Sequence, residues 1–276
     1  RGAPQSNASR QYLGMGRNLP IIASTKVAGI RGSSTNIDAN CEWPLSQWNS
    51  PISDRELLEA QSLVGTGISD IVTGAAFTDT AILSNDEISD YRILHFATHG
   101  LVTAPNPSCP AKPSLLTSFG DENSDGLLAF DEIFDLKLDA DIVILSACDT
   151  AGKASIEATR NAGVSSGGGT ALDGLVRSFI GAGGRSVLAS HWPAPDDFRA
   201  TERLINGLFS DGRGQSITEA LRQSQLELMD DPITSHPYYW SGFALIGDGA
   251  RPFLPEATDA AASAETISSA TKAALK

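Results

Sequence analysis

The sequence predicts an α/β fold in which a mainly parallel sheet is covered by helices on both faces. The run at 142–145 is apolar and leads into small residues, as a buried strand of a parallel sheet does. A second β-prone run spans 91–97 and also ends in small residues. Short runs like these alternate along the chain with amphipathic helical stretches, and this alternation is typical of a parallel sheet with helical crossovers.

The other predicted strands are short β-prone segments bounded by turn-forming residues. They lie at 12–16, 71–74, 114–119, 186–190 and 243–246, and residues 127–129 begin a further element. The segments at 30–51 and 102–113 are rich in loop-forming residues, Pro above all in the second, so both are interpreted as loops.

The first helix is predicted at 53–63. Ser53 is a favourable N-cap, and Glu56 three residues later completes a capping box. Gly65 ends the helix. The apolar face of this helix is expected to consist of Leu57, Leu58, Ala60 and Val64.

Five further helices follow from apolar positions at helical spacing. The second is expected to be capped by Thr78 or Asp79 and the third by Asp131. The five lie at 77–83, 130–136, 172–182, 196–209 and 216–230.

Two side chains suited to nucleophilic catalysis follow neighbouring predicted strands. His99 comes after the strand at 91–97, and Cys148 comes after the strand at 142–145. Because α/β sheets place their chemistry at the carboxyl ends of the strands, the thiol and the imidazole can form a nucleophile and its base. Position alone leaves a buried structural thiol as the alternative for Cys148. His95 falls on the same strand face as His99 and is interpreted as packed within the sheet.

These two motifs resemble those of a known family. His-Phe-Ala-Thr-His-Gly at 95–100 and Leu-Ser-Ala-Cys-Asp-Thr at 145–150 are similar to the CHAT domain, a caspase-like family of bacterial cysteine peptidases related to separase. The resemblance continues through 174–193, 216–228 and 237–248. It implies a caspase-like α/β/α sandwich with a mainly parallel central sheet.

The resemblance also implies the roles of individual residues. His99 is expected to be the general base and Cys148 the nucleophile. We expect the backbone N–H groups of Gly100 and Cys148 to form the oxyanion hole. Caspase-like folds place one wall of the substrate groove after the strand at 186–190. The substrate-binding candidates are Asp149, Ser190, His191, Trp192, Asp196 and Asp197.

Each substrate-binding candidate has a structural alternative. Trp192 is equally well explained as a core side chain. Asp196 and Asp197 fit helix caps, and Asp149 fits simple exposure to solvent. If the acidic residues have a role, it is to bind a basic side chain at the cleavage site.

One acidic loop matches the pattern of a calcium-binding EF-hand. Its ligand positions are Asp121, Asn123, Asp125 and Glu132. An EF-hand also needs a helix on each side, whereas 114–119 is predicted to be a strand. We therefore expect no metal and no cofactor, and keep the calcium loop as the alternative.

Composition restricts the partners of this chain. The formal charge is -13 and 41% of the residues are apolar, which is enough for a core. Nucleic acids and anionic membranes select basic surfaces, so neither is an expected partner. No apolar run has the length of a membrane helix. Cys41 and Cys109 are interpreted as free thiols, with a disulfide as the alternative in an oxidising compartment.

We divide the chain into an N-terminal linker at 1–17, the CHAT peptidase domain at 18–250 and a tail at 251–276. It begins at Arg1 without an apolar leader, so we expect a piece of a longer protein. The family suggests an upstream tetratricopeptide-repeat domain. A bacterial cytoplasmic location is expected, or a periplasmic or secreted one if a signal peptide lies upstream.

The predicted activity is that of a cysteine endopeptidase, which uses His99 and Cys148 to cleave proteins or peptides under the control of an upstream domain or partner. The alternative is a catalytically silent scaffold or interaction module. The Gly- and Ser-rich segment 152–170 is interpreted as a flexible insertion and a possible self-processing loop, with Lys153 and Arg160 as cut sites.

Overall fold

The fold is described from a computed structural model. It describes residues 4–21, 43, 45–101, 108, 112–121, 123–146, 170–192, 195 and 197–254.

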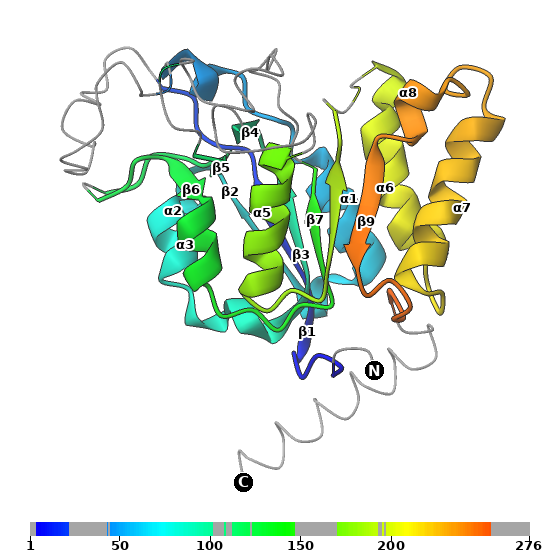
Figure 1. The fold of residues 1–276 in the computed structure, drawn as a ribbon, viewed down its shortest axis with the longest axis horizontal. Helices are drawn as coiled ribbons and strands as arrows, with labels where there is room; N and C mark the ends of the chain where they lie inside the picture. The colour runs from blue at the N-terminus through cyan, green and yellow to red at the C-terminus, as the bar shows by residue number, and fades with distance from the viewer. Residues whose placement is uncertain are drawn as a thin grey trace, which may run out of the picture.

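A six-stranded sheet forms the centre of the molecule (Figure 1). Its strand order is β2-β1-β3-β7-β8-β9. All neighbouring strands pair in parallel except β8 and β9, which are antiparallel. The strands are β1 Arg10–Gly16, β2 Ser69–Thr73, β3 Tyr91–Ala97, β7 Ile142–Leu145, β8 Ser186–Ser190 and β9 Phe243–Gly247.

Helices cover both faces of this sheet, so the predicted α/β/α sandwich with a mainly parallel sheet is confirmed (Figure 1). One face carries α1 Arg55–Val64, α6 Ala200–Asp211 and α7 Ile217–Asp230. The other face carries α2 Asp79–Leu83, α3 Phe130–Asp135 and α5 Thr170–Gly181. The short helix α8 Pro237–Trp240 precedes β9.

The central strand β7 is apolar on both sides because each side meets a helical layer. In β7, Val143 and Leu145 pack into the core beneath α2, α3 and α5, whereas Ile142 and Ile144 pack beneath α1, α6 and α7. All four side chains are buried, which explains why the sequence of β7 is apolar throughout rather than alternating.

A second, three-stranded sheet lies beyond the carboxyl end of β3. It is antiparallel with the order β4-β5-β6. Its strands are β4 Gly100–Leu101, β5 Ser114–Leu116 and β6 Leu127–Ala129. The predicted strand at 114–119 therefore ends earlier than expected, and it pairs within this small sheet instead of the central one.

Several predicted helix starts are wrong, each for a local reason. Helix α1 begins at Arg55 with Asp54 as its N-cap, and the carboxylate of Glu56 binds His95 instead of closing a capping box. Leu58, expected on the apolar face, is 48% exposed. For α3 the N-cap is Ala129 rather than Asp131.

The helix predicted from residue 196 begins at Ala200, because Phe198 and Arg199 both adopt positive φ angles of 56° and 55°. A 3-10 turn, Asp197–Arg199, precedes the helix. The predicted cap of Thr78 is confirmed, since its hydroxyl accepts the N–H of Ala81.

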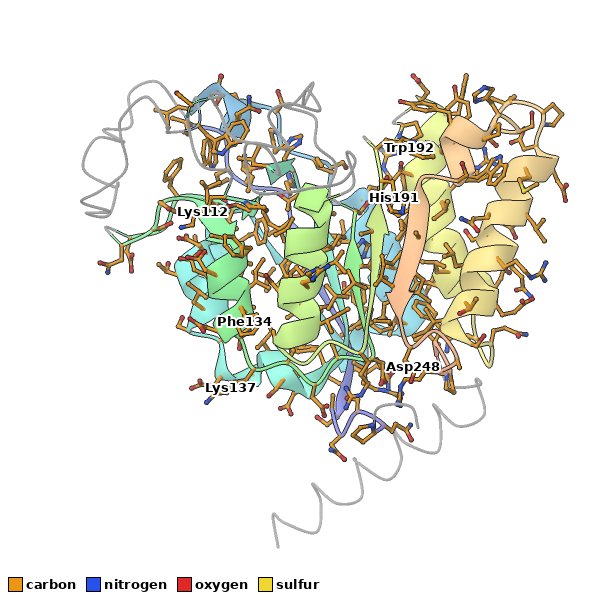
Figure 2. All side chains as sticks on the ribbon, viewed as in Figure 1. Lys112, Phe134, Lys137, His191, Trp192 and Asp248 are labelled. Atoms are coloured by element: carbon orange, nitrogen blue, oxygen red, sulfur yellow. The ribbon has the colours of Figure 1, made fainter. Side chains whose placement is uncertain are left out.

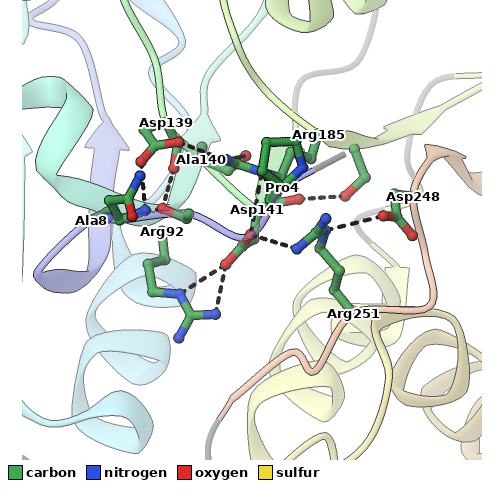
Figure 3. A network of polar contacts seen from close by, with 12 residues as sticks. Pro4, Ala8, Arg92, Asp139, Ala140, Asp141, Arg185, Asp248 and Arg251 are labelled. Carbon is green, nitrogen blue, oxygen red and sulfur yellow. Dashed lines mark hydrogen bonds and ion pairs between the residues drawn. The ribbon is translucent and has the colours of Figure 1, made fainter. Parts of the chain in front are cut away.

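An ion network joins segments at the amino end of the sheet (Figure 3). Asp141, just before β7, contacts Arg92 at 2.7 Å, Arg185 at 3.8 Å and Arg251 at 4.0 Å. Arg185 also hydrogen-bonds the carbonyl of Pro4, at the start of the described chain. Strand β1, Arg10–Gly16, also belongs to the central sheet. The sheet therefore begins before residue 18, where the sequence predicted the domain to start.

Candidate active site

The carboxyl ends of β3 and β7 lie side by side. Phe96 pairs with Leu145, and the N–H of Ser146 donates to the carbonyl oxygen of Phe96 at 2.9 Å. His99 follows Phe96 by three residues, and Cys148 follows Leu145 by the same number. Cys148 itself lies outside the described residues.

The small sheet holds His99 in place. The hydroxyl of Thr98 donates to the carbonyl oxygen of Leu116 at 2.5 Å, and the N–H of Leu116 donates to the carbonyl oxygen of His99 at 2.9 Å. His99 is 9% exposed. Its backbone is therefore fixed on both sides, while part of the residue still reaches solvent.

A backbone carbonyl orients the imidazole of His99. Nε2 lies 2.6 Å from the carbonyl oxygen of Ser50, in the segment before α1. A carbonyl can only accept a hydrogen bond, so Nε2 carries the proton in this contact. In a neutral ring, Nδ1 is then the basic nitrogen. Ser50 was not predicted as a site residue, because a residue that acts through its carbonyl leaves no side-chain signal.

His99 lines a cavity of about 580 Å³. Its walls come from the segment before α1, from the start of α1, from the end of β7 and from the start of α6. The lining residues are Ser46, Gln47, Ser50, Pro51, Ile52, Ser53, Arg55, Glu56, His99, Ser146, Pro195, Arg199, Thr201 and Glu202.

Ion pairs occupy the α6 side of the cavity. Arg199 binds both carboxylate oxygens of Glu202, and Arg55 lies 3.8 Å from the same carboxylate. Arg199 also contacts Glu59 at 3.2 Å. The guanidinium of Arg199 lowers the pKa of Glu202 below its usual range, so this carboxylate stays ionised at neutral pH.

A buried chain of three polar side chains ends at the cavity wall. His95 is fully buried, with Nε2 at 2.7 Å from Oε1 of Glu56 and Nδ1 at 2.9 Å from the hydroxyl of Tyr12. Glu56 was predicted only as part of a capping box, although the sequence also contains a signal that its side chain is buried. Residues 56, 60 and 64 fall on one helix face, and Ala60 and Val64 are buried there.

The structure describes four of the six substrate-binding candidates, Ser190, His191, Trp192 and Asp197. Trp192 and His191 follow β8, near α8 (Figure 2). The indole Nε1 of Trp192 donates to the carbonyl oxygen of Tyr238 at 3.3 Å. The hydroxyl of Ser190 donates to the carbonyl oxygen of Trp192 at 2.6 Å, and Asp197 is exposed. None of these four lines the cavity of His99.

Of the remaining residues predicted for catalysis and substrate binding, the structure describes Gly100 alone. Gly100 is buried in β4, opposite Leu115. Asp149 and Asp196 lie outside the described residues, as do Cys41, Cys109 and the segment 152–169 with Lys153 and Arg160.

The acidic loop uses its oxygens within the protein. Asp121 accepts the N–H of Asn123, Asp125 accepts the N–H of Leu127, and Glu132 accepts the N–H of Ala129. Within the ranges that the structure describes, no group of three or more His, Cys, Asp or Glu is arranged to hold a metal ion. The loop is preceded by β5 and contains β6, so it lacks the helix–loop–helix form of an EF-hand.

We predict that Glu132→Gln stabilises the protein at pH 8 and has little effect at pH 4. Burial raises the pKa of Glu132, which the N–H of Ala129 opposes, and Asp125 and Asp79 raise it further. A raised folded-state pKa gives stability that is present at low pH and lost as pH rises. Glutamine mimics the protonated form, so the expected gain at pH 8 is about 0.5 kcal/mol.

Urea unfolding at the two pH values measures this gain. Glu219→Gln on α7 is the control. Arg222 lowers the pKa of Glu219, so this replacement is expected to decrease the stability at pH 8. A loss of stability at pH 8 in Glu132→Gln would contradict the prediction.

Comparisons with known proteins place the chain in a family. The family model of the CHAT domain matches residues 3–248. Tetratricopeptide repeat protein 28 of Homo sapiens is 28% identical over 228 residues, and that of Mus musculus is 26% identical over 230 residues. Each match covers 71% of this chain and 8% of the relative's length.

A solved structure is also similar. The Arg specific cysteine proteinase gingipain R aligns with a TM-score of 0.47 at 10% identity, over 89% of this chain and 49% of that chain. Within the described residues, no helix has the length and apolarity needed to span a membrane. The family match covers most of the chain, and it includes both β-strand motifs from which the resemblance was inferred. The chain belongs to the CHAT domain family.

Proposed function

We propose that this chain is a cysteine endopeptidase in which His99 activates Cys148. One observation carries the proposal: Ser146, two residues before Cys148, lines the same cavity as His99. Two residues span at most about 7 Å of chain, and this short link between Ser146 and Cys148 supports a position of the thiol close to His99.

The orientation of His99 suits the chemistry. With its proton on Nε2 and held by Ser50, the ring offers Nδ1 as the base for the thiol of Cys148. The thiolate then attacks the peptide carbonyl, and His99 returns the proton to the leaving amine. Water hydrolyses the resulting thioester. The N–H groups of Gly100 and Cys148 stabilise the oxyanion.

Regulation is proposed to come from a tetratricopeptide-repeat region. Both curated relatives are named for this repeat, and the chain matches 8% of their length. The bacterial origin and the cytoplasmic location inferred from the family resemblance stay predictions, as does self-processing within 152–170.

A peptide acyloxymethyl ketone tests the proposed nucleophile. We expect it to label Cys148 selectively over Cys41 and Cys109, because a thiol beside a base is the more nucleophilic. Mass spectrometry of tryptic digests locates the label. His99→Ala should remove the selectivity, whereas His236→Ala, a change at an exposed histidine, should preserve it. Slow and equal labelling of all three thiols would instead support the catalytically silent scaffold.

A further inference from the structure

The carboxylate of Glu56 has a position that its role in α1 does not explain. Glu56 is 8% exposed and yet lines the cavity of His99 and Ser146. Oε1 is bound to His95, and none of the described residues hydrogen-bonds to Oε2. Because Glu56 lines the cavity, Oε2 is the carboxylate oxygen available to a ligand there.

His95 and Tyr12 hold the carboxylate of Glu56 in place, and neither side chain carries a permanent positive charge. Burial raises the pKa of Tyr12 well above its usual range, so its hydroxyl keeps its proton. When that hydroxyl donates to Nδ1 of His95, the proton of a neutral ring lies on Nε2 and is donated to Glu56. Glu56 has no arginine or lysine partner in the part of the chain that the structure describes.

The other charges of the cavity are arranged differently. Arg55 and Arg199 have side chains that are 57% and 52% exposed, and both contact Glu202. The side chain of Glu56 is 10% exposed. The guanidinium groups therefore lie toward solvent and are paired with a carboxylate, while the buried end of the cavity presents a carboxylate held by an imidazole.

We infer that Glu56 binds the basic side chain of a lysine or arginine at the cleavage position of the substrate, with His95 and Tyr12 as positioning residues. This rests on the proposed peptidase function. The cavity volume of about 580 Å³ lies within the usual size of ligand pockets. The formal charge of -13 also favours the approach of basic peptides.

Binding of a small basic probe tests the inference without any catalysis. Cys148→Ala protein is titrated with Nα-acetyl-arginine amide and with the citrulline analogue, which has nearly the same shape but no charge. We expect the arginine probe to bind at least tenfold more tightly, and Glu56→Gln to abolish this difference. The inference would be overturned if the two probes bound with equal affinity, or if neither probe bound.

Glu56→Gln is chosen because its amide oxygen can still accept from His95, which keeps the buried hydrogen bond. Glu219→Gln removes the same charge on α7, which contributes no residue to the cavity lining, and should leave the preference intact. Glu56→Asp serves as a second variant, since it keeps the charge and shortens its reach. Thermal melts of all three separate a loss of binding from a loss of folding.

Cleavage of matched peptides then separates this inference from the proposed function. Peptides that differ only by arginine, lysine, norleucine or glutamate at the cleavage position are compared by kcat/KM. We expect arginine and lysine to be preferred, and Glu56→Gln to lower the arginine-to-norleucine ratio at least tenfold. Cleavage with another preference would refute the role of Glu56 and keep the peptidase. Arginine-probe binding without any cleavage or labelling would refute the peptidase and keep the binding site.

Discussion

Replacement of His99 by alanine is expected to lower kcat/KM for peptide cleavage by about 10²–10⁴-fold, the usual contribution of a positioned general acid–base. The imidazole is held at Nε2 by the carbonyl oxygen of Ser50 and lies in the same cavity as Ser146. Without it, the thiol of Cys148 loses its base and the leaving amine loses its proton donor. The substrate for this measurement is the peptide selected by a library cleavage profile, with Cys148→Ala as the inactive reference.

His236→Ala is the control, because His236 is exposed and caps α8. It should retain the activity of the unchanged protein. A His99→Ala variant with the same kcat/KM as the unchanged protein would show that the imidazole takes no part in the reaction. Circular dichroism and thermal melts establish that the variants are folded.

Asp141→Ala is expected to produce the largest loss of stability, about 3–5 kcal/mol. Its side chain is 4% exposed and contacts three arginines whose own side chains are 17%, 9% and 14% exposed. Alanine leaves Arg92 without the carboxylate that it contacts at 2.7 Å, whereas Arg185 and Arg251 also pair with Asp139 and Asp248. The largely buried guanidinium of Arg92, left without a carboxylate, sets the size of the effect.

Urea unfolding measures this loss. The control is Asp248→Ala, because Asp248 pairs with Arg251 but is 25% exposed (Figure 3). Asp248 still reaches solvent and Arg251 keeps its contact with Asp141, so the loss of this pair is expected to cost about 1 kcal/mol or less. Equal losses in the two variants would show that the network at the amino end of the sheet does not depend on its buried carboxylate.

The sheet was largely predictable from the sequence because each strand is marked by a local run of apolar or β-prone residues. The run of β7 is apolar throughout, as a strand between two helical layers must be, and the structure confirms it as a central parallel strand. The hydroxyl cap at Thr78 was also predictable, since side-chain capping depends on residues within one helical turn.

Other features depend on contacts between distant segments. The capping box at Ser53 was wrong because the carboxylate of Glu56 has a stronger partner in His95, 39 residues away. The predicted start of α6 was wrong because Phe198 and Arg199 adopt a left-handed conformation that their side chains do not indicate.

Only the part of the candidate site that has a local sequence pattern was predictable. His99 belongs to a strand-end motif that carries its own signal, and the structure places it in a cavity. Ser50 contributes a main-chain atom, which no sequence pattern marks. Trp192 was a candidate for a pocket wall, but it packs toward α8, where any side chain at Gly242 would approach its indole ring to about 3.0 Å.

The distance between Nδ1 of His99 and Sγ of Cys148 tests the central claim most directly. A crystal structure of the unreacted protein that resolves residue 148 would give this value. The account predicts a separation of about 3–4 Å, within reach of proton transfer. A sulfur atom that faces the opposite side of the central sheet, or that lies beyond about 7 Å with no path into the cavity, would contradict it.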